Sequence, residues 1–182
     1  MTHHPLSRPA AQRGFSLVEA GIVLAVTAVV ATSAAPSLQR VVDTRRIDGA
    51  ATQLAADIQF VRIEAVARNQ PLRLSLQAAG GASCYVVHTG AANQCSCTAE
   101  GPAQCSGGAQ ALKAVRLTGT DRTALQGNVA SIAFDPLHGT STPTGTLRVI
   151  GSDGRAVHHV INIMGRVRSC SPQAAVPGYR AC

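Results

Sequence analysis

The stretch "RGFSLVEAGIVLAVTAVVATSAAPSLQR", residues 13–40, decides how this chain is organised. Between residues 15 and 35 it carries one charged side chain, that of Glu19. A helix of this length, rising about 1.5 Å per residue, matches the roughly 30 Å hydrocarbon core of a bilayer. The sequence therefore predicts that residues 15–35 form a transmembrane helix.

Glu19 is the unusual residue of this helix, because an ionisable group inside a bilayer costs roughly 2.5 to 3.5 kcal/mol and usually has a partner and a function. The preceding segment is polar and basic and ends at Gly14. A cut between Gly14 and Phe15 would leave a positive amine four residues from Glu19, on the same helix face. We therefore predict a leader at residues 1–14 and a role for Glu19 in binding the terminal amine of a neighbouring subunit. An isolated Glu19 that reaches the membrane interface is the alternative.

The helical pattern continues to residue 69. Pro36 removes one helical hydrogen bond, which predicts a bend or a local melt at that position. Apolar residues then recur at intervals of three and four and are expected to pack on the chain's own domain, while the polar residues between them, Asp57 included, are expected at the surface. The stripe consists of Leu38, Val41, Val42, Ala51, Leu54, Ala55, Ile58, Val61 and Ala65. Asn69-Gln70-Pro71 ends the helix, because a residue before proline disfavours helical geometry.

Beyond Pro71 the pattern changes to the alternation typical of strands. The expected strands are 71–77, 83–89, 114–118, 131–134, 146–150 and 156–163. The turn "GSDGR", 151–155, predicts that the last two are antiparallel neighbours. The fold class is therefore α+β: a long N-terminal helix, with transmembrane residues 15–35 and a second half at 36–69, packed on a small antiparallel β-domain at 70–182. A Cys-rich insertion lies at about 90–111.

The six cysteines all follow the anchor, and an even number in an oxidising compartment favours disulfides. They are Cys84, Cys95, Cys97, Cys105, Cys170 and Cys182. Fifteen full pairings are possible. Our preferred pairing joins Cys170 to Cys182 and uses the other four to staple the insertion. Zinc held by those four is the alternative, although paired C-x-x-C spacing is absent.

No arrangement of residues in the sequence points to catalysis. His158 and His159 are adjacent in an expected strand and so point to opposite faces, which makes joint metal binding awkward. His88 and His138 are isolated, and no phosphate-binding glycine loop is present. We therefore expect no enzyme activity, no cofactor and no metal.

The C-terminal end of the chain is its basic end. The chain carries a formal net charge of +7, and residues 146–182 contain five arginines against Asp153 alone. A positive balance of this kind favours anionic partners.

Within this end, "GRVRSC", residues 165–170, is the informative stretch. If the preceding strand continues through it, Arg166 and Arg168 project from one face, about 6.6 to 6.8 Å apart, and Val167 faces the core. Gly165 would allow a bulge or a close backbone approach. Two neighbouring guanidinium groups suit phosphate oxygens. A charged edge strand that resists aggregation is the alternative.

Two resemblances to known proteins add to this interpretation. "GFSLVEAGIVLAV" resembles the class III leader of type IV pilins and pseudopilins, which implies cleavage by a prepilin peptidase after Gly14, N-methylation of Phe15 and an assembly role for Glu19. The chain also resembles the FimT/GspH family of minor pilins and secretion pseudopilins. The stretches that carry this second resemblance are "VRIEAVARNQPLRLSL" (61–76), "SIAFDPLHGT" (131–140), "GTLRVI" (145–150) and "VINIMGRVR" (160–168).

The family resemblance implies a type IV pilin-like fold, with a single pass through the inner membrane, a periplasmic C-terminal domain and later residence in the extracellular pilus beside major and minor pilins. FimT-type members that act in natural transformation carry a Gly-Arg-x-Arg motif that contacts DNA, and it maps here onto residues 165–168. The resemblance thus implies binding of double-stranded DNA without sequence preference. The residues expected to contribute are Arg166, Arg168, Gly165, Arg180, Arg148 and Arg155.

Three alternatives to DNA uptake remain open at this stage. The chain could be a structural GspH-type pseudopilin of type II secretion, or a minor pilin that only primes pilus assembly. It could also be an adhesin-like tip module that binds an acidic surface polymer.

Overall fold

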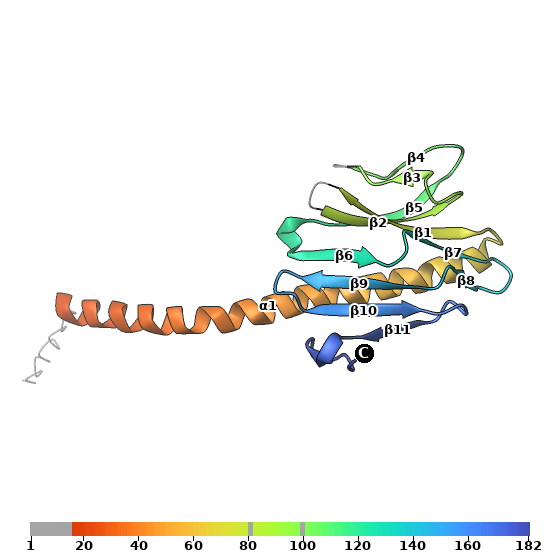
Figure 1. Ribbon diagram of the computed structural model, residues 1–182. Helices are drawn as coiled ribbons and strands as arrows, with labels where there is room; N and C mark the ends of the chain where they lie inside the picture. Colours follow the sequence, from red (N-terminus) through yellow and green to blue (C-terminus); the bar gives the residue numbers. More distant parts are fainter. Residues whose placement is uncertain (1–15, 80–81, 99–100) are drawn as a thin grey trace, which may run out of the picture. The chain divides into compact units, whose positions relative to one another are not determined.

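The computed structural model describes residues 16–79, 82–98 and 101–182 (Figure 1). The chain divides into two compact units, 1–39 and 40–182, and helix α1 (Leu17–Ala67) contributes to both. In the described part, α1 is long and apolar enough to cross a membrane, and the side chains of that apolar window are exposed. Glu19 lies exposed in the first turn of α1. Gly14 and Phe15 lie outside the described residues.

Helix α1 runs through Pro36 without interruption, so the local melt expected there is not observed. The helix ends at Ala67, two residues before the predicted boundary. Asn69 follows with a φ of 50°, the left-handed conformation with which helices commonly end.

The apolar stripe of α1 is buried only in part. Its buried residues recur at intervals of four and three: Ile47, Ala51, Leu54, Ile58, Val61 and Ala65. Leu38, Val41 and Val42 are 63%, 58% and 47% exposed, so the prediction that they pack on their own domain is wrong. Within residues 40–182, the hydrophobic core covers the helix from Ile47 onward, and the apolar side chains of Val41 and Val42 stay outside it.

The β-domain consists of three antiparallel sheets. A five-stranded sheet has the order β5-β2-β1-β7-β8, a four-stranded sheet the order β11-β10-β9-β6, and β3 pairs with β4. The strands are β1 (Leu72–Ala79), β2 (Ala82–Thr89), β3 (Cys95–Ser96), β4 (Gln104–Cys105), β5 (Ala111–Leu117), β6 (Thr123–Gly127), β7 (Ser131–Phe134), β8 (Ser141–Thr142), β9 (Gly145–Gly151), β10 (Ala156–Ile161) and β11 (Val167–Cys170). Two short 3-10 helices, η1 (Gly119–Asp121) and η2 (Pro172–Ala174), complete the described elements.

All six strands expected from the sequence are present, and β9 and β10 are antiparallel neighbours as predicted. The expected strand 156–163 stops at Ile161, because a turn begins at Asn162. Five short strands, of two to five residues each, were not predicted from the sequence: β3, β4, β6, β8 and β11.

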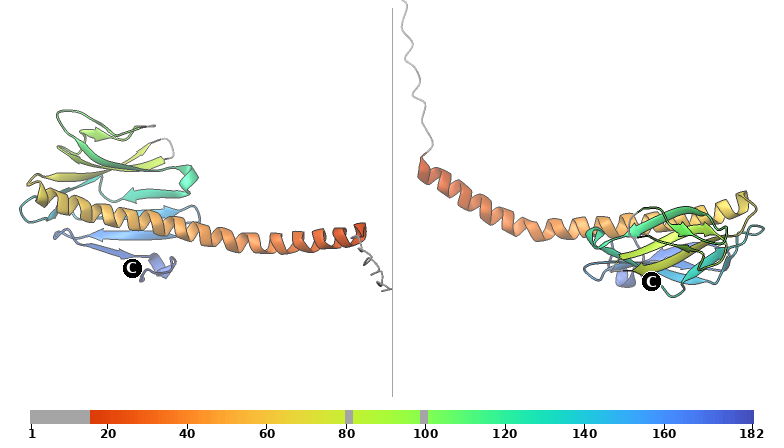
Figure 2. Two further views of the ribbon diagram at one scale, coloured as in Figure 1. Left: turned by 180° about the vertical axis from the view of Figure 1, so that it is seen from behind. Right: turned by 90° about the horizontal axis from the view of Figure 1, so that it is seen from above.

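The core lies between α1 and the two larger sheets, which the helix crosses on one side (Figure 2). Its buried residues run from Ile47 to Val176, so the complete core belongs to the unit 40–182. A fragment starting at Arg40 therefore retains everything that holds the β-domain together.

Asp57 sits inside this core and not at the surface, where the sequence analysis placed it. It is 3% exposed and accepts hydrogen bonds from the Tyr85 hydroxyl at 2.6 Å and from the Lys113 ammonium at 2.6 Å. Lys113 is the only lysine in the chain. Burial, together with the hydrogen bond to Asp57 and its charge, raises the pKa of Tyr85. A buried charge is tolerated when it is paired and hydrogen-bonded, so this cluster ties α1 to β2 and β5.

The disulfides fasten the insertion and the C-terminus to the sheets. Cys84 pairs with Cys97, Cys95 with Cys105, and Cys170 with Cys182. The first two use the four cysteines that the zinc alternative would need, and the described chain has no free cysteine. The first disulfide joins the insertion to β2, and Gln77 of β1 adds hydrogen bonds to the Cys95 carbonyl and the Cys97 amide.

His159 is a buried histidine of the four-stranded sheet. Its side chain is 0% exposed, Nδ1 lies 2.8 Å from the Ser169 hydroxyl, and Nε2 has no partner among the described residues. Burial, and secondarily the charge of His158, lowers the pKa of His159 from 6.5 to about 4. The folded protein thus holds this ring neutral at pH values where an unfolded chain protonates it.

Replacement of Tyr85 by Phe tests the Asp57 cluster. Loss of a hydrogen bond to a charged, buried carboxylate is expected to lower the free energy of unfolding by about 1.5 to 3 kcal/mol. Tyr179→Phe is the matched control, since its hydroxyl binds Asp48 at a half-buried position. Urea unfolding of fragment 40–182 gives both values, and equal losses for the two variants would contradict the special role of Asp57.

Acidification tests the buried histidine. Because the pKa of His159 is depressed in the folded state, its neutral form favours folding above about pH 6.5, and this contribution is lost as pH falls toward 4. Between pH 7.5 and pH 5 the wild type should lose about 2 kcal/mol more unfolding free energy than His159→Gln. Urea unfolding at the two pH values measures the difference, and parallel losses would refute the assignment.

Candidate nucleic-acid interface

The hairpin of β10 and β11 lies at one edge of the four-stranded sheet (Figure 1). Arg166 and Arg168 belong to this hairpin, and Arg148 lies on the inner strand β9. The chain reverses direction between Ile161 and Val167, so the expectation of a strand continuing through residues 165–168 is wrong. The alternation expected of that strand is nevertheless present. Arg166 and Arg168 are exposed, whereas Val167 is half-buried and packs against the core.

The turn between the strands is held by backbone hydrogen bonds. The Asn162 amide donates to the Arg166 carbonyl at 3.1 Å, and the Gly165 amide donates to the Asn162 carbonyl at 2.9 Å. The Asn162 side chain accepts from the Arg166 amide at 3.0 Å. Ser141, which is buried, donates its amide to the Ile163 carbonyl at 2.8 Å and its hydroxyl to the Asn162 carbonyl at 2.6 Å.

At Gly165, any residue with a side chain would force the surrounding atoms to move. Its φ is 69°, in the left-handed region. A Cβ atom there would lie 2.5 Å from the Gly139 carbonyl oxygen and 2.9 Å from Cδ of Arg62. The Arg62 Nε donates to that same carbonyl at 3.0 Å. The backbone approach at Gly165 is therefore as close as the sequence suggested, and Arg62 of α1 supports it.

The strand register places further groups on the outward face of the sheet. Arg168 of β11 lies opposite Val160 of β10, and His158, two residues along β10, lies opposite Arg148 of β9. Two strand spacings and one step of two residues separate Arg168 from Arg148, which gives about 12 Å between their Cα atoms. The charge of Arg148 contributes, after burial, to a lowered pKa of His158. Arg148 is exposed like the hairpin arginines.

Arg180 is held beside the end of β11 by the C-terminal loop. The Ser171 amide donates to the Arg180 carbonyl at 2.8 Å, and the Cys170–Cys182 disulfide closes the loop. Val176 of the loop is fully buried, and the buried Ser171 hydroxyl donates to the Ala156 carbonyl at 2.8 Å. The loop is thus an integrated part of the domain, which keeps the exposed Arg180 beside the C-terminal end of β11.

Arg155 differs from the other four predicted arginines, because its guanidinium already has partners. Its Nε donates to Asp153 at 2.7 Å, and its Nη1 donates to the Thr44 hydroxyl of α1 at 2.7 Å. In the described chain, Arg148, Arg166, Arg168 and Arg180 have no side-chain hydrogen bond or ion pair. Residues 156–182 also contain no Asp or Glu. The unpaired arginines of the predicted set therefore lie on β9, in the β10–β11 turn, on β11 and in the C-terminal loop, and Arg155 serves the fold.

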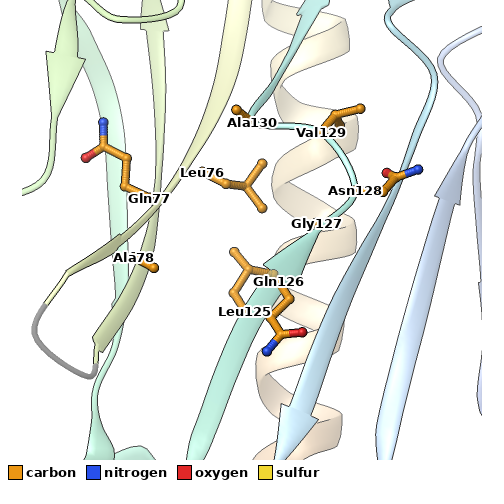
Figure 3. Close-up of a pocket in the computed structure, with 9 residues that line it drawn as sticks. All are labelled: Leu76, Gln77, Ala78, Leu125, Gln126, Gly127, Asn128, Val129 and Ala130. Carbon is orange, nitrogen blue, oxygen red and sulfur yellow. The ribbon is translucent and has the colours of Figure 1, made fainter.

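The remaining candidate sites carry less charge or no reactive group. A cleft of about 420 Å³ is lined by residues 76–78 and 125–130, none of them ionisable (Figure 3). His88 is buried between the Ser75 hydroxyl and the Thr89 carbonyl. The exposed His138 lies beside Asp135. Among residues 16–79, 82–98 and 101–182, no group of three His, Cys, Asp or Glu side chains is placed to hold a metal ion.

Residues of this region that sequence reasoning missed are those that build the turn: Arg62, Gly139, Ser141 and Asn162. A sequence signal existed for one of them, since Asn162 and Gly165 are typical turn residues three positions apart. The contacts of Arg62 and Ser141 join segments far apart in the chain, and no local pattern indicates them.

Comparison with known proteins gives one family and one solved structure. The sequence model of the family described as "Type II transport protein GspH" matches residues 50–165. No curated protein matches the chain. The structure of the type IV minor pilin FimU from Pseudomonas aeruginosa, strain PAO1, is similar with a TM-score of 0.49 and 18% sequence identity, over 71% of this chain and 94% of that chain.

The long N-terminal helix packed on antiparallel sheets is a type IV pilin-like fold. Because the family match spans more than half of its length, the protein belongs to the GspH family.

Proposed function

We propose that this protein is a minor type IV pilin that binds double-stranded DNA for uptake in natural transformation. The observation that carries the proposal is the set of exposed arginines on and beside the edge of the four-stranded sheet, with guanidinium groups that no described carboxylate neutralises. The set consists of Arg148, Arg166, Arg168 and Arg180.

The chemistry of this surface suits a phosphate backbone. A guanidinium group presents a planar fork of donors that meets two phosphate oxygens at once. Contacts of this kind fix a protein on DNA but carry no sequence information. Gly165 shapes the turn so that Arg166 and Arg168 both face outward, and the Cys170–Cys182 disulfide keeps Arg180 beside the other end of β11.

The proposal places the protein first in the inner membrane and then in a pilus. A prepilin peptidase would remove residues 1–14, and the new amine at Phe15 would bind Glu19 of a neighbouring subunit. The exposed apolar face of α1 supports this assembly, because Leu38, Val41 and Val42 find no cover within their own chain. Major and other minor pilins would supply it.

A second function is a structural subunit of type II secretion, or a pilin that primes assembly without binding DNA. One observation favours it: the family match ends at Gly165, before Arg166 and Arg168. The family likeness therefore covers the scaffold and leaves out most of the basic surface. Fragment 40–182 of such a protein would show no affinity for DNA beyond that of other basic proteins.

The arginine pair is tested by titrating fragment 40–182 with fluorescent duplex DNA over a series of salt concentrations. Arg166→Gln combined with Arg168→Gln should weaken binding at least tenfold and flatten the log-log salt slope by about 1.8, since each lost phosphate contact accounts for about 0.9. Arg45→Gln with Arg46→Gln, on exposed positions of α1, is the matched control and should change neither.

Wild-type affinity in the Arg166/Arg168 variant would show that the site lies elsewhere. Competition by heparin without any preference for DNA would instead support an acidic surface polymer as the ligand.

Leader processing is tested separately in cells. Mass spectrometry of the mature protein should find Phe15, N-methylated, as its first residue, and Gly14→Glu should leave Met1 attached because the peptidase site is lost. Gly21→Ala, inside the helix, is the control and should be processed normally. A mature protein that retains Met1, or one cut well beyond Phe15, would remove the proposed pilus setting.

A further inference from the structure

The tip of the β10–β11 hairpin displays two large apolar side chains to solvent. Ile163 is 62% exposed and Met164 is 51% exposed, and they stand next to each other in the turn that precedes Gly165 and Arg166. Isolated exposed apolar residues are common on soluble proteins. An adjacent pair at the tip of a hairpin, directly beside a cationic site, is better explained by a contact with a ligand.

The backbone under these side chains is firmly held. Hydrogen bonds from Ser141 reach the carbonyls of both Asn162 and Ile163, and the turn closes through its own amides. On the other side, Gly165 is packed against the Gly139 carbonyl, which Arg62 of α1 holds. A tip that is already ordered loses little conformational entropy when it binds, so contacts made by its exposed side chains contribute more fully to the binding free energy.

We propose that Ile163 and Met164 form an apolar wedge that enters a DNA groove and presses against a base step while Arg166 and Arg168 hold the flanking phosphates. This inference rests on the proposed function and deepens it, because it assigns the hairpin a contact with bases as well as with the backbone. Apolar side chains that enter the minor groove partially unstack a step, and nearby arginines stabilise the deformed backbone.

The surroundings of the tip favour DNA as the occupant. Arg166 is two residues from Met164, Arg168 follows on the same face, and residues 156–182 contain no carboxylate side chain. The nearby loop carries Asp135, but this carboxylate accepts the Leu137 and His138 amides of its own turn. An apolar tip beside the guanidinium groups of Arg166 and Arg168 suits a duplex, in which charged phosphates flank stacked base steps that apolar side chains can enter.

The wedge is tested with fragment 40–182, which contains the complete core, and duplex DNA that carries the fluorescent base 2-aminopurine. Ile163→Ser combined with Met164→Ser should weaken binding about tenfold. The factor should be the same at every salt concentration, because the lost contact is apolar and releases no counterions. The wild type should raise 2-aminopurine emission by unstacking, and the variant should not. Val41→Ser with Val42→Ser, at exposed apolar positions of α1, is the matched control and should behave as wild type.

The outcomes separate the wedge from the site itself. Weaker binding by the Arg166/Arg168 variant together with unchanged binding by the Ile163/Met164 variant overturns the wedge alone, and the apolar tip is then left for a protein neighbour. A shallower salt slope in the Ile163/Met164 variant also overturns it, since the loss would be electrostatic. If wild-type fragment shows no affinity for duplex DNA, the proposed function fails and the wedge with it. The single variant Met164→Gln controls for a folding defect. It should unfold at the same urea midpoint as the wild type and still give a smaller rise in 2-aminopurine emission.

Discussion

The contact between Gly165 and the Gly139 carbonyl is the constraint on which the functional surface depends. It brings the β10–β11 turn against the loop before β8, and Arg62 of α1 completes the junction. With its φ of 69°, Gly165 reverses the chain so that β11 begins at Val167 with its apolar side chain toward the core. The outward direction of Arg166 and Arg168 follows from the packing of the half-buried Val167 against the core, because side chains alternate along a strand. The basic surface is thus a consequence of how the turn is packed.

A second constraint, the buried carboxylate of Asp57, determines how α1 meets the sheets. The stripe from Ile47 to Ala65 would allow the helix to slide or rotate slightly, since apolar contacts have no direction. Hydrogen bonds from Tyr85 and Lys113 remove that freedom, because a displaced helix would leave a charged group buried without a partner. The position of Arg62, one turn and a half further along the same helix, is fixed by the same contacts. Helix position, junction and turn therefore depend on one another.

Much of this architecture can be predicted from the sequence, where the determinants are local. The period change at Pro71, the six predicted strands and the turn at 151–155 each result from short-range patterns. Asp57 was misplaced because its partner Lys113 lies 56 residues away and no local pattern links them. The hairpin after Ile161 was missed because the apolar character continues through Ile163 and Met164, which the strand pattern counts as core. Arg155 was grouped with its basic neighbours because its hydrogen bond to Thr44 joins residues 111 positions apart, and no local pattern indicates such a contact.

The family match ends at Gly165, so it covers the framework of the domain and leaves out the C-terminal segment. Residues 50–165 include most of the buried part of α1, strands β1 to β10 and the turn up to Gly165, which together form the shared framework. Arg166, Arg168, Arg180 and the Cys170–Cys182 disulfide all lie beyond it, on a segment whose Val176 and Ser171 are fully buried. That segment is therefore folded into the domain although the family model does not describe it. Its function has to be derived from its own charge and packing, since a shared fold does not by itself determine function.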